Sequence, residues 1–165
     1  MSSQLIVQIQ EVHKRFKLGA HDIQALQGVS LDVQTEDFLS LAGSSGSGKT
    51  TLLNLMGGID SPERGKVLID GEDISQLEDW KVSRLRAEKI GFIFQTFNLI
   101  PVLTALENVE YPLTMLGIPA LERRERASSA LERVGLGRFA DHRPDQLSGG
   151  QRQRVAIARA IVKKP

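Results

Sequence analysis

One eight-residue stretch constrains the fold of this 165-residue chain more than any other: GSSGSGKT, at residues 43–50. Its spacing is that of a phosphate-binding loop, which needs a strand before it and a helix after it. Residues 38–42 (FLSLA) are apolar enough for a buried strand, and residues 51–56 (TLLNLM) predict a helix that Gly57 and Gly58 end. This context favours a phosphate-binding loop over a flexible Gly/Ser-rich loop.

The residue types of this stretch suit a nucleoside triphosphate. A helix N-terminus offers unpaired N–H groups and a partial positive charge, and glycines let consecutive N–H groups wrap the phosphates. Lys49 supplies a full charge toward the β- and γ-phosphates, and the hydroxyl of Thr50 suits Mg²⁺. The candidate phosphate-binding residues are Gly43, Ser44, Ser45, Gly46, Ser47, Gly48, Lys49, Thr50 and Thr51.

Composition excludes several other kinds of site. The net charge is +1, which gives no support for a nucleic-acid partner or for adsorption to an anionic membrane. There is no cysteine, and the three histidines are too scattered for a zinc site. The sequence shows no secretory leader and no run apolar enough to span a bilayer, so we expect a soluble, intracellular chain.

Apolar stretches predict strands at residues 5–10, 29–33, 66–69 and 90–94. Residues 14–22 predict an exposed turn into the second strand. Phe16 lies in this turn, and the sequence leaves open whether it is a hairpin side chain or a platform for a nucleotide base. Gln95 directly follows the apolar run at 90–94 (IGFIF), which is typical of a parallel strand. Ligands of open α/β sheets bind at such strand ends, so Gln95 is a candidate site residue.

The chain becomes helical after residue 96. A short helix is predicted around residues 80–87, and Thr104 with Glu107 forms a capping box for a helix that contains Pro112 and stops at Gly117. The next helix covers residues 120–134. Its arginines alternate with glutamates, which favours a solvated face over a basic patch; they are Arg123, Arg124 and Arg126.

A second glycine motif, LSGGQ at residues 147–151, begins the last predicted helix. Ser148 is a natural N-cap, and Val155, Ala158, Ile161 and Val162 give the helix one apolar side. The motif could be an ordinary capped helix or a second anion-binding helix end. Capping alone does not explain two adjacent glycines, since each costs about 0.8–1 kcal/mol relative to Ala in a helix.

With both motifs in place, the chain resembles the nucleotide-binding subunits of ABC transporters over essentially its whole length. LSGGQ looks like their signature motif, Gln95 like the glutamine of their Q-loop, and Phe16 stands where the family stacks adenine on an aromatic side chain. The stretches NLIP (98–101), LTALENV (103–109) and HRP (142–144) look most like the lipoprotein-release, macrolide-export and cell-division subgroup.

The resemblance implies an α/β P-loop NTPase fold of ABC type, with a RecA-like parallel core, an N-terminal antiparallel β part and an α-helical subdomain. Residues 1–165 would form one domain, divided into a β-rich and P-loop core (1–95), a helical subdomain (96–146) and the signature motif with its helix (147–165).

The resemblance also implies a function: two subunits face each other head to tail and hydrolyse Mg-ATP between them. Lys49 and Thr50 would hold phosphate and Mg²⁺ in one subunit, while Ser148, Gly149, Gly150 and Gln151 of the other complete the site. Gln95 would reach the metal or the attacking water. ATP favours the closed dimer because only that state makes both sets of phosphate contacts.

The implied partners are a second ATP-binding subunit, in a homodimer, and an integral-membrane permease subunit or fused permease domain. That arrangement would place the chain in the cytoplasm, peripheral on the inner face of the cell membrane. Two alternatives differ in class: an ATPase of DNA repair or chromosome maintenance, and a nucleotide-binding module that does not hydrolyse. Long coiled coils or zinc modules typical of the first are missing here.

Departures from the family pattern are of two kinds. Ser44 replaces a proline, Phe16 a tyrosine, and Glu36 with Asp37 a glycine; we expect mild effects, because no phosphate-contacting group is removed. The larger departure is that the sequence stops at Pro165, before the strand that carries the family's acidic Walker B residues and the histidine beyond it. We therefore expect a fragment with little or no ATPase activity by itself, doubtful stability, and an unpaired strand edge at residues 90–94.

Overall fold

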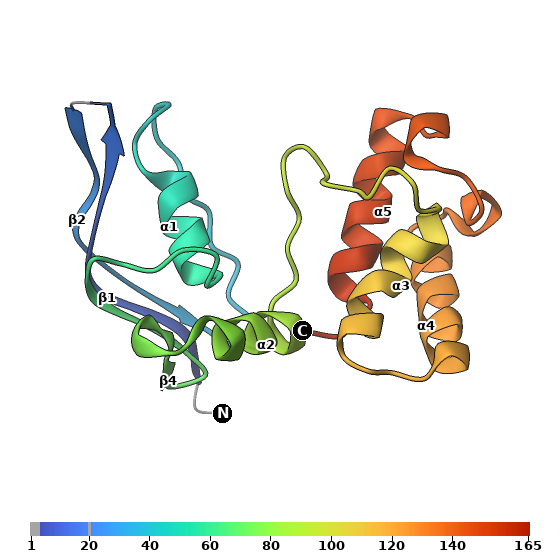
Figure 1. Cartoon of the computed structure of the whole chain (residues 1–165), viewed down its shortest axis with the longest axis horizontal. Coiled ribbons are helices and arrows are strands. Elements are labelled where there is room, and N and C mark those ends of the chain that lie inside the picture. The colour runs from blue at the N-terminus through green and yellow to red at the C-terminus, as the bar shows by residue number, and fades with distance from the viewer. Residues whose placement is uncertain (1–3, 20) are drawn as a thin grey trace. The chain divides into compact units, whose positions relative to one another are not determined.

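The structure is a computed structural model that describes residues 4–19 and 21–165, and the chain divides into two compact units (Figure 1). Residues 1–83 form the first, here called the strand unit, and residues 84–165 form the second, the helical unit. Helix α2 (Asp79–Lys89) contains the boundary between them.

The strand unit is an antiparallel sheet that carries one helix. Its strands are β1 (Leu5–Leu18), β2 (His21–Gln34), β3 (Arg64–Ile69) and β4 (Glu72–Asp73), in the order β2-β1-β3-β4. Helix α1 (Lys49–Met56) lies beside the two long strands in Figure 1 and buries Leu52 and Leu55. A short 3-10 helix, η1 (Ile74–Gln76), follows β4. The sheet contributes its own buried residues to this core: Ile9, Val12, Leu26, Val67 and Ile69.

The β1–β2 hairpin is tighter than the sequence suggests. We predicted an exposed turn over residues 14–22, and this is wrong, because both strands continue through most of it. Phe16 is paired with Ile23, and Lys17 with Asp22. Polar and apolar residues do not alternate regularly in this part of the chain, so its sequence does not indicate strands. Backbone pairing between β1 and β2 nevertheless extends both strands through it.

The helical unit is a bundle of α3 (Ala105–Met115), α4 (Ala120–Arg133) and α5 (Gly149–Ile161), which pack side by side (Figure 1). Two 3-10 helices, η2 (Gly137–Phe139) and η3 (Pro144–Gln146), connect α4 to α5. The core between the helices is apolar and includes Leu106, Val109, Leu113, Leu131, Leu136, Leu147 and Val155.

Several predictions for these helices are confirmed. Thr104 caps α3 in a capping box with Glu107, and Pro112 lies inside the helix. The arginine-rich face of α4 is engaged with acids, since Arg126 pairs with Glu122. No helix in the described part of the chain has both the length and the apolar character needed to cross a bilayer.

Two predicted strands are not strands. Residues 38–42 and 90–94 have no ladder partner in the described sheet, and Phe38 is 99% exposed. A strand needs a neighbouring backbone for its N–H and C=O groups, and an apolar composition does not supply one. In residues 90–94 the rings of Phe92 and Phe94 stack on each other, with centroids 5.5 Å apart.

Candidate functional site

The phosphate loop leads directly into α1, as its motif predicts. Gly48 is the N-cap residue, with φ at +86°, and α1 begins at Lys49 with no side chain capping it. The first turn therefore offers its N–H groups to the loop side, where an anion is stabilised by the helix dipole. The helical half of the predicted context is confirmed; the strand before the loop is not seen.

Gly48 is required by both conformation and space. Its φ lies in the left-handed region, and an added Cβ would sit 2.5 Å from the carbonyl oxygen of Ala25 on β2. Only glycine lets the loop approach the sheet this closely. The close contact fixes the start of α1 against β2.

The Lys49 ammonium lies across the loop. Its Nζ donates to the carbonyl oxygens of Gly43 (3.0 Å) and Ser44 (2.7 Å) and to the hydroxyl of Ser47 (3.2 Å). These bonds hold the ammonium against the loop. Lys49 is half-buried, and these three acceptors match the three N–H donors of its ammonium, so a phosphate would have to replace at least one of them.

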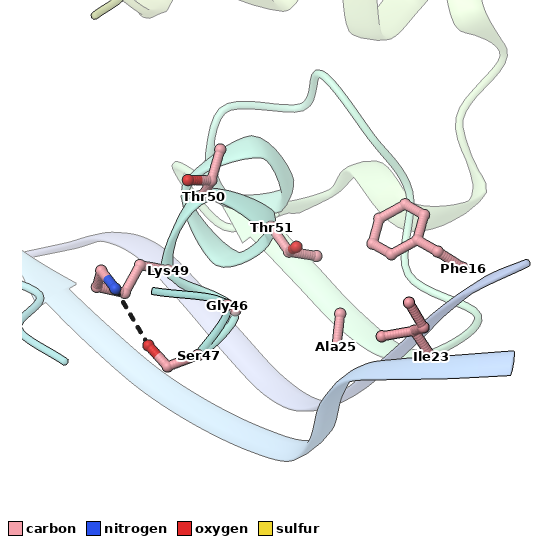
Figure 2. Close-up of a pocket in the computed structure, with 9 residues that line it drawn as sticks. Phe16, Ile23, Ala25, Gly46, Ser47, Lys49, Thr50 and Thr51 are labelled. Carbon is pink, nitrogen blue, oxygen red and sulfur yellow. Dashed lines mark hydrogen bonds between the residues drawn. The ribbon is translucent and has the colours of Figure 1, made fainter. Parts of the chain in front are cut away.

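A hollow of about 250 Å³ joins the loop to the β1–β2 hairpin. Figure 2 shows Phe16, Ile23 and Ala25 at its apolar end and Gly46, Ser47 and Lys49 at its polar end, with Thr51 between them. The sequence identified Phe16 and the loop but missed Ile23 and Ala25. The tight hairpin brings these two residues to the hollow. Their position depends on the β1–β2 register, which could not be predicted because the sequence suggested a turn over residues 14–22.

Mg²⁺ would have few protein ligands here. No group of three or more His, Cys, Asp or Glu side chains gathers as a metal site within residues 4–19 and 21–165. Thr50, exposed at the start of α1, offers one hydroxyl. This fits a cation held chiefly by phosphate oxygens and water, as Mg²⁺ commonly is in such sites.

Gln95 lies in an exposed turn of the helical unit, where Phe97 N donates to Phe94 O at 3.0 Å. Phe97 and Asn98 follow in left-handed conformations, with φ of 62° and 47°. Arg159 of α5 spans this turn, donating to the carbonyls of Phe97 and Asn98 at 2.6 Å each. Burial lowers the pKa of the Arg159 guanidinium.

Ser148 caps α5 as predicted. Its Oγ accepts from Gln151 N at 3.3 Å, and Gln151 Oε1 accepts from Ser148 N at 2.7 Å. A Cβ added to Gly149 or Gly150 would meet nothing within 4 Å, so packing in the chain does not require either glycine. Their missing side chains leave the start of α5 uncovered, which suits an approaching ligand.

The structure thus brings together one half of the predicted site in each unit. The phosphate loop and Phe16 line one hollow in the strand unit, while Gln95 and residues 148–151 belong to the helical unit. The binding roles assigned to all these residues remain predictions.

Residues 26–165 match the ABC transporter family. The chain is 46% identical over 162 residues to the macrolide export ATP-binding/permease protein MacB of Brucella melitensis, covering 98% of this chain and 25% of that protein. It is 45% identical to the lipoprotein-releasing system ATP-binding protein LolD of Pseudomonas fluorescens, covering 100% of this chain and 73% of LolD. Both relatives fall within the subgroup that the sequence predicts.

A solved structure agrees with these relatives. It is a dimer of the ATP-binding cassette MJ0796 in a post-hydrolysis state bound to ADP and Pi. The two chains are 48% identical with a TM-score of 0.91, over 97% of this chain and 71% of that one. The antiparallel sheet and the helices are therefore those of an ABC-type cassette, and the predicted fold class is confirmed.

Proposed function

Because the chain belongs to the ABC transporter family of ATP-binding proteins, we propose that it binds Mg-ATP and, within a complete head-to-tail dimer, hydrolyses ATP to power a membrane transporter. The proposal rests most on one observation. A single hollow has an exposed aromatic side chain at one end and a glycine loop with a lysine at the other, which is the order of groups in a nucleotide.

The residues of the hollow divide the work of binding. Phe16, 43% exposed, would stack the base, supported by Ile23. The loop amides, the start of α1 and Lys49 would hold the phosphates. Thr50 would hold Mg²⁺ from one side, and Gln95 would reach the metal or the attacking water. Bound Mg²⁺ would supply charge neutralisation for phosphoryl transfer.

A second copy of the chain would complete the site with Ser148, Gly149, Gly150 and Gln151. Support comes from the uncovered start of α5 and from the dimeric state of the solved cassette. ATP would favour the dimer because only there does the triphosphate contact both helix starts. Loss of the γ-phosphate removes that differential affinity, and the dimer opens.

The membrane partner is inferred from the relatives' names, which describe export and lipoprotein release. MacB joins an ATP-binding part and a permease in one protein, whereas LolD is named as an ATP-binding protein. We infer a permease subunit or a fused permease domain, which would hold this chain at the inner face of the cell membrane. The same names favour transport over DNA repair.

Binding and turnover should be measured separately on the 165-residue chain. Calorimetric titration with ATP in the presence of Mg²⁺ should show binding that Lys49→Gln weakens by at least about tenfold, the scale of one lost charge-assisted bond. Lys17→Gln, which removes an equal charge from β1 outside the loop, is the control. Equal binding by Lys49→Gln and the wild type would contradict the proposal. Phosphate release by the wild type that Lys49→Gln abolishes would exclude the non-hydrolysing module.

A further inference from the structure

Lys14 of β1 contacts both the segment after α1 and the ring of Phe16, the side chain proposed to stack the base. Its Nζ donates to Asp60 Oδ1 at 2.6 Å and to the carbonyl oxygen of Ser61 at 2.8 Å. The same ammonium lies over the ring of Phe16, 5.5 Å from the ring centroid. The Lys14 side chain is only 14% exposed, so the charge is held mainly by these partners.

The strand geometry explains the contact with the ring. Lys14 and Phe16 are two residues apart on β1, so their side chains share one face. A cation over an aromatic face is attracted by about 0.5–1 kcal/mol at exposed sites and about 2 kcal/mol or more when desolvated. Since Lys14 is largely buried, it restricts the orientation of a ring that is itself 43% exposed.

The other end of this contact is anchored to the helix of the phosphate loop. Asp60 follows α1 closely, and its backbone N–H donates to Asn54 O of α1 at 3.3 Å. Its Oδ1 also accepts from Ser61 N at 2.8 Å, which fixes the carboxylate. One ammonium therefore connects the Phe16 ring with the end of the helix that begins at Lys49.

We propose that Lys14 is a positioning residue for the nucleoside end of the site, holding the Phe16 ring in register with the phosphate loop through Asp60. Lys14 does not line the hollow, so it would act on a nucleotide through Phe16. This inference rests on the proposed function, since it assumes that a base stacks on Phe16.

The chain provides a matched control on the next residue. Arg15 also pairs with the segment after α1, its Nε lying 2.9 Å from Glu63 Oε2, and in the described part of the chain the cation found over the Phe16 ring is that of Lys14. Arg15→Met and Lys14→Met each remove one positive charge and one ion pair from the same strand. A general electrostatic effect of losing one positive charge near the site should be shared by the two variants.

The test compares Mg-ATP with Mg-tripolyphosphate, which has the phosphates without a base, by calorimetry on the 165-residue chain. Lys14→Met should raise the Kd for ATP about three- to tenfold, the range expected for a cation–π contact that orients the ring. Its Kd for tripolyphosphate should change by less than about twofold. Arg15→Met should leave the ratio of the two Kd values as in the wild type. Lys14→Arg, which keeps the positive charge that Lys14→Met removes, should also give the wild-type ratio.

Each other outcome overturns a defined part of the argument. Equal losses for ATP and tripolyphosphate, or a Lys14→Met variant that matches Arg15→Met, would overturn the role of Lys14 and leave the proposed function intact. Failure of the wild type to bind either ligand would overturn the proposed function and this inference with it. If Lys14→Met does not fold, Asp60→Asn, which releases the ammonium but keeps the side-chain shape, must show the same selective loss for ATP.

Discussion

Glu36 has a backbone φ of 70°, in the left-handed region that a Cβ disfavours. It follows β2, and the resemblance to ABC subunits places a glycine at Glu36 and Asp37. The sequence suggested that this departure is mild because no phosphate contact is lost. In the structure, the departure instead places a residue with a Cβ in a left-handed backbone conformation, which lowers stability.

Replacing Glu36 by glycine should therefore stabilise the chain. The left-handed conformation costs about 1–2 kcal/mol for a residue with a Cβ, and glycine's extra unfolded-state freedom offsets about 0.5–1 kcal/mol of that gain. We expect Glu36→Gly to raise the free energy of unfolding by about 0.5–1 kcal/mol in urea titrations. Asp32→Gly, a similar change inside β2, should lower it; a stabilising Asp32→Gly would contradict the reasoning.

Gly48 and Gly46 separate two requirements of the phosphate loop. Both have positive φ, at +86° and +79°, but only at Gly48 would a Cβ meet the sheet, 2.5 Å from Ala25 O. We expect Gly48→Ala to displace the start of α1 and weaken ATP binding by at least about tenfold. Gly46→Ala should weaken ATP binding less than Gly48→Ala does. Its backbone strain should lower the free energy of unfolding by about 1 kcal/mol. Similar ATP affinities for the two variants, measured by calorimetry, would refute the steric argument.

At the level of elements, the helix starts are defined by caps. In the capping box of α3, the Thr104 backbone N–H donates to the Glu107 carboxylate, and the Glu107 backbone N–H donates to the Thr104 hydroxyl oxygen. The pKa of the Glu107 carboxyl is lowered, first by the hydrogen bond from the Thr104 backbone and then by the Thr104 side chain. Because the folded-state pKa is lowered, this contribution is present above the ordinary value of 4.5 and is lost as the pH falls through the folded-state value.

Glu107→Gln keeps a side chain able to complete the capping box, as Gln151 does in α5, but removes the charge near the helix N-terminus. We expect it to cost about 0.3–1 kcal/mol of unfolding free energy at pH 7. The difference from the wild type should shrink as the pH falls below the ordinary value of 4.5 and through the lowered folded-state pKa. Glu125→Gln, in the exposed middle of α4 and away from any helix N-terminus, is the control and should leave the free energy of unfolding at pH 7 nearly unchanged. A difference that does not change with pH would show that the charge is not responsible.

Arg159 is the element-scale connection between α5 and the turn after Gln95. Its planar fork matches the two carbonyls of Phe97 and Asn98, a geometry that a lysine does not reproduce. Arg159→Lys should speed amide hydrogen exchange at Phe97 and Asn98 about tenfold. Arg154→Lys removes a guanidinium that makes one bond, 3.3 Å to Val134 O, and should not change exchange there. Unchanged exchange in Arg159→Lys would show that the turn is held by other contacts.

The elements differ in how far the sequence predicts them. Helices α3, α4 and α5 could be found because each has an apolar stripe and at least one local end signal: the caps Thr104 and Ser148, or a glycine just after the helix, as in α3 and α4. Strands at 38–42 and 90–94 were expected from composition, but strand formation depends on a partner elsewhere in space. The phosphate loop was identified because its chemistry is local. Ile23 and Lys14 were missed, because their places depend on the hairpin register and on Asp60.

At the level of the whole molecule, two separate cores support two halves of the predicted site. Ile9 is 1% exposed in the strand unit and Leu131 is 0% exposed in the helical unit. Each truncation to alanine should cost about 2–5 kcal/mol in its own core. Ile9→Ala should increase hydrogen exchange in β1–β3 and Leu131→Ala in α3–α5, each leaving the other unit protected. Uniform loss of protection in both variants would instead indicate one cooperative unit.

The cap of α5 bears on how two copies of the chain would recognise a nucleotide. Aspartate caps helices about as well as serine, but an ionised carboxylate has only acceptors to offer. The Ser148 oxygen already accepts from Gln151 N, and its own hydrogen remains for a group outside the helix. Under the proposed function, Ser148→Asp would keep the fold and repel the phosphates. Serine and aspartate are equivalent as helix caps. The requirement for serine at residue 148 would therefore come from its hydroxyl hydrogen, which could be donated to a phosphate bound between two copies of the chain.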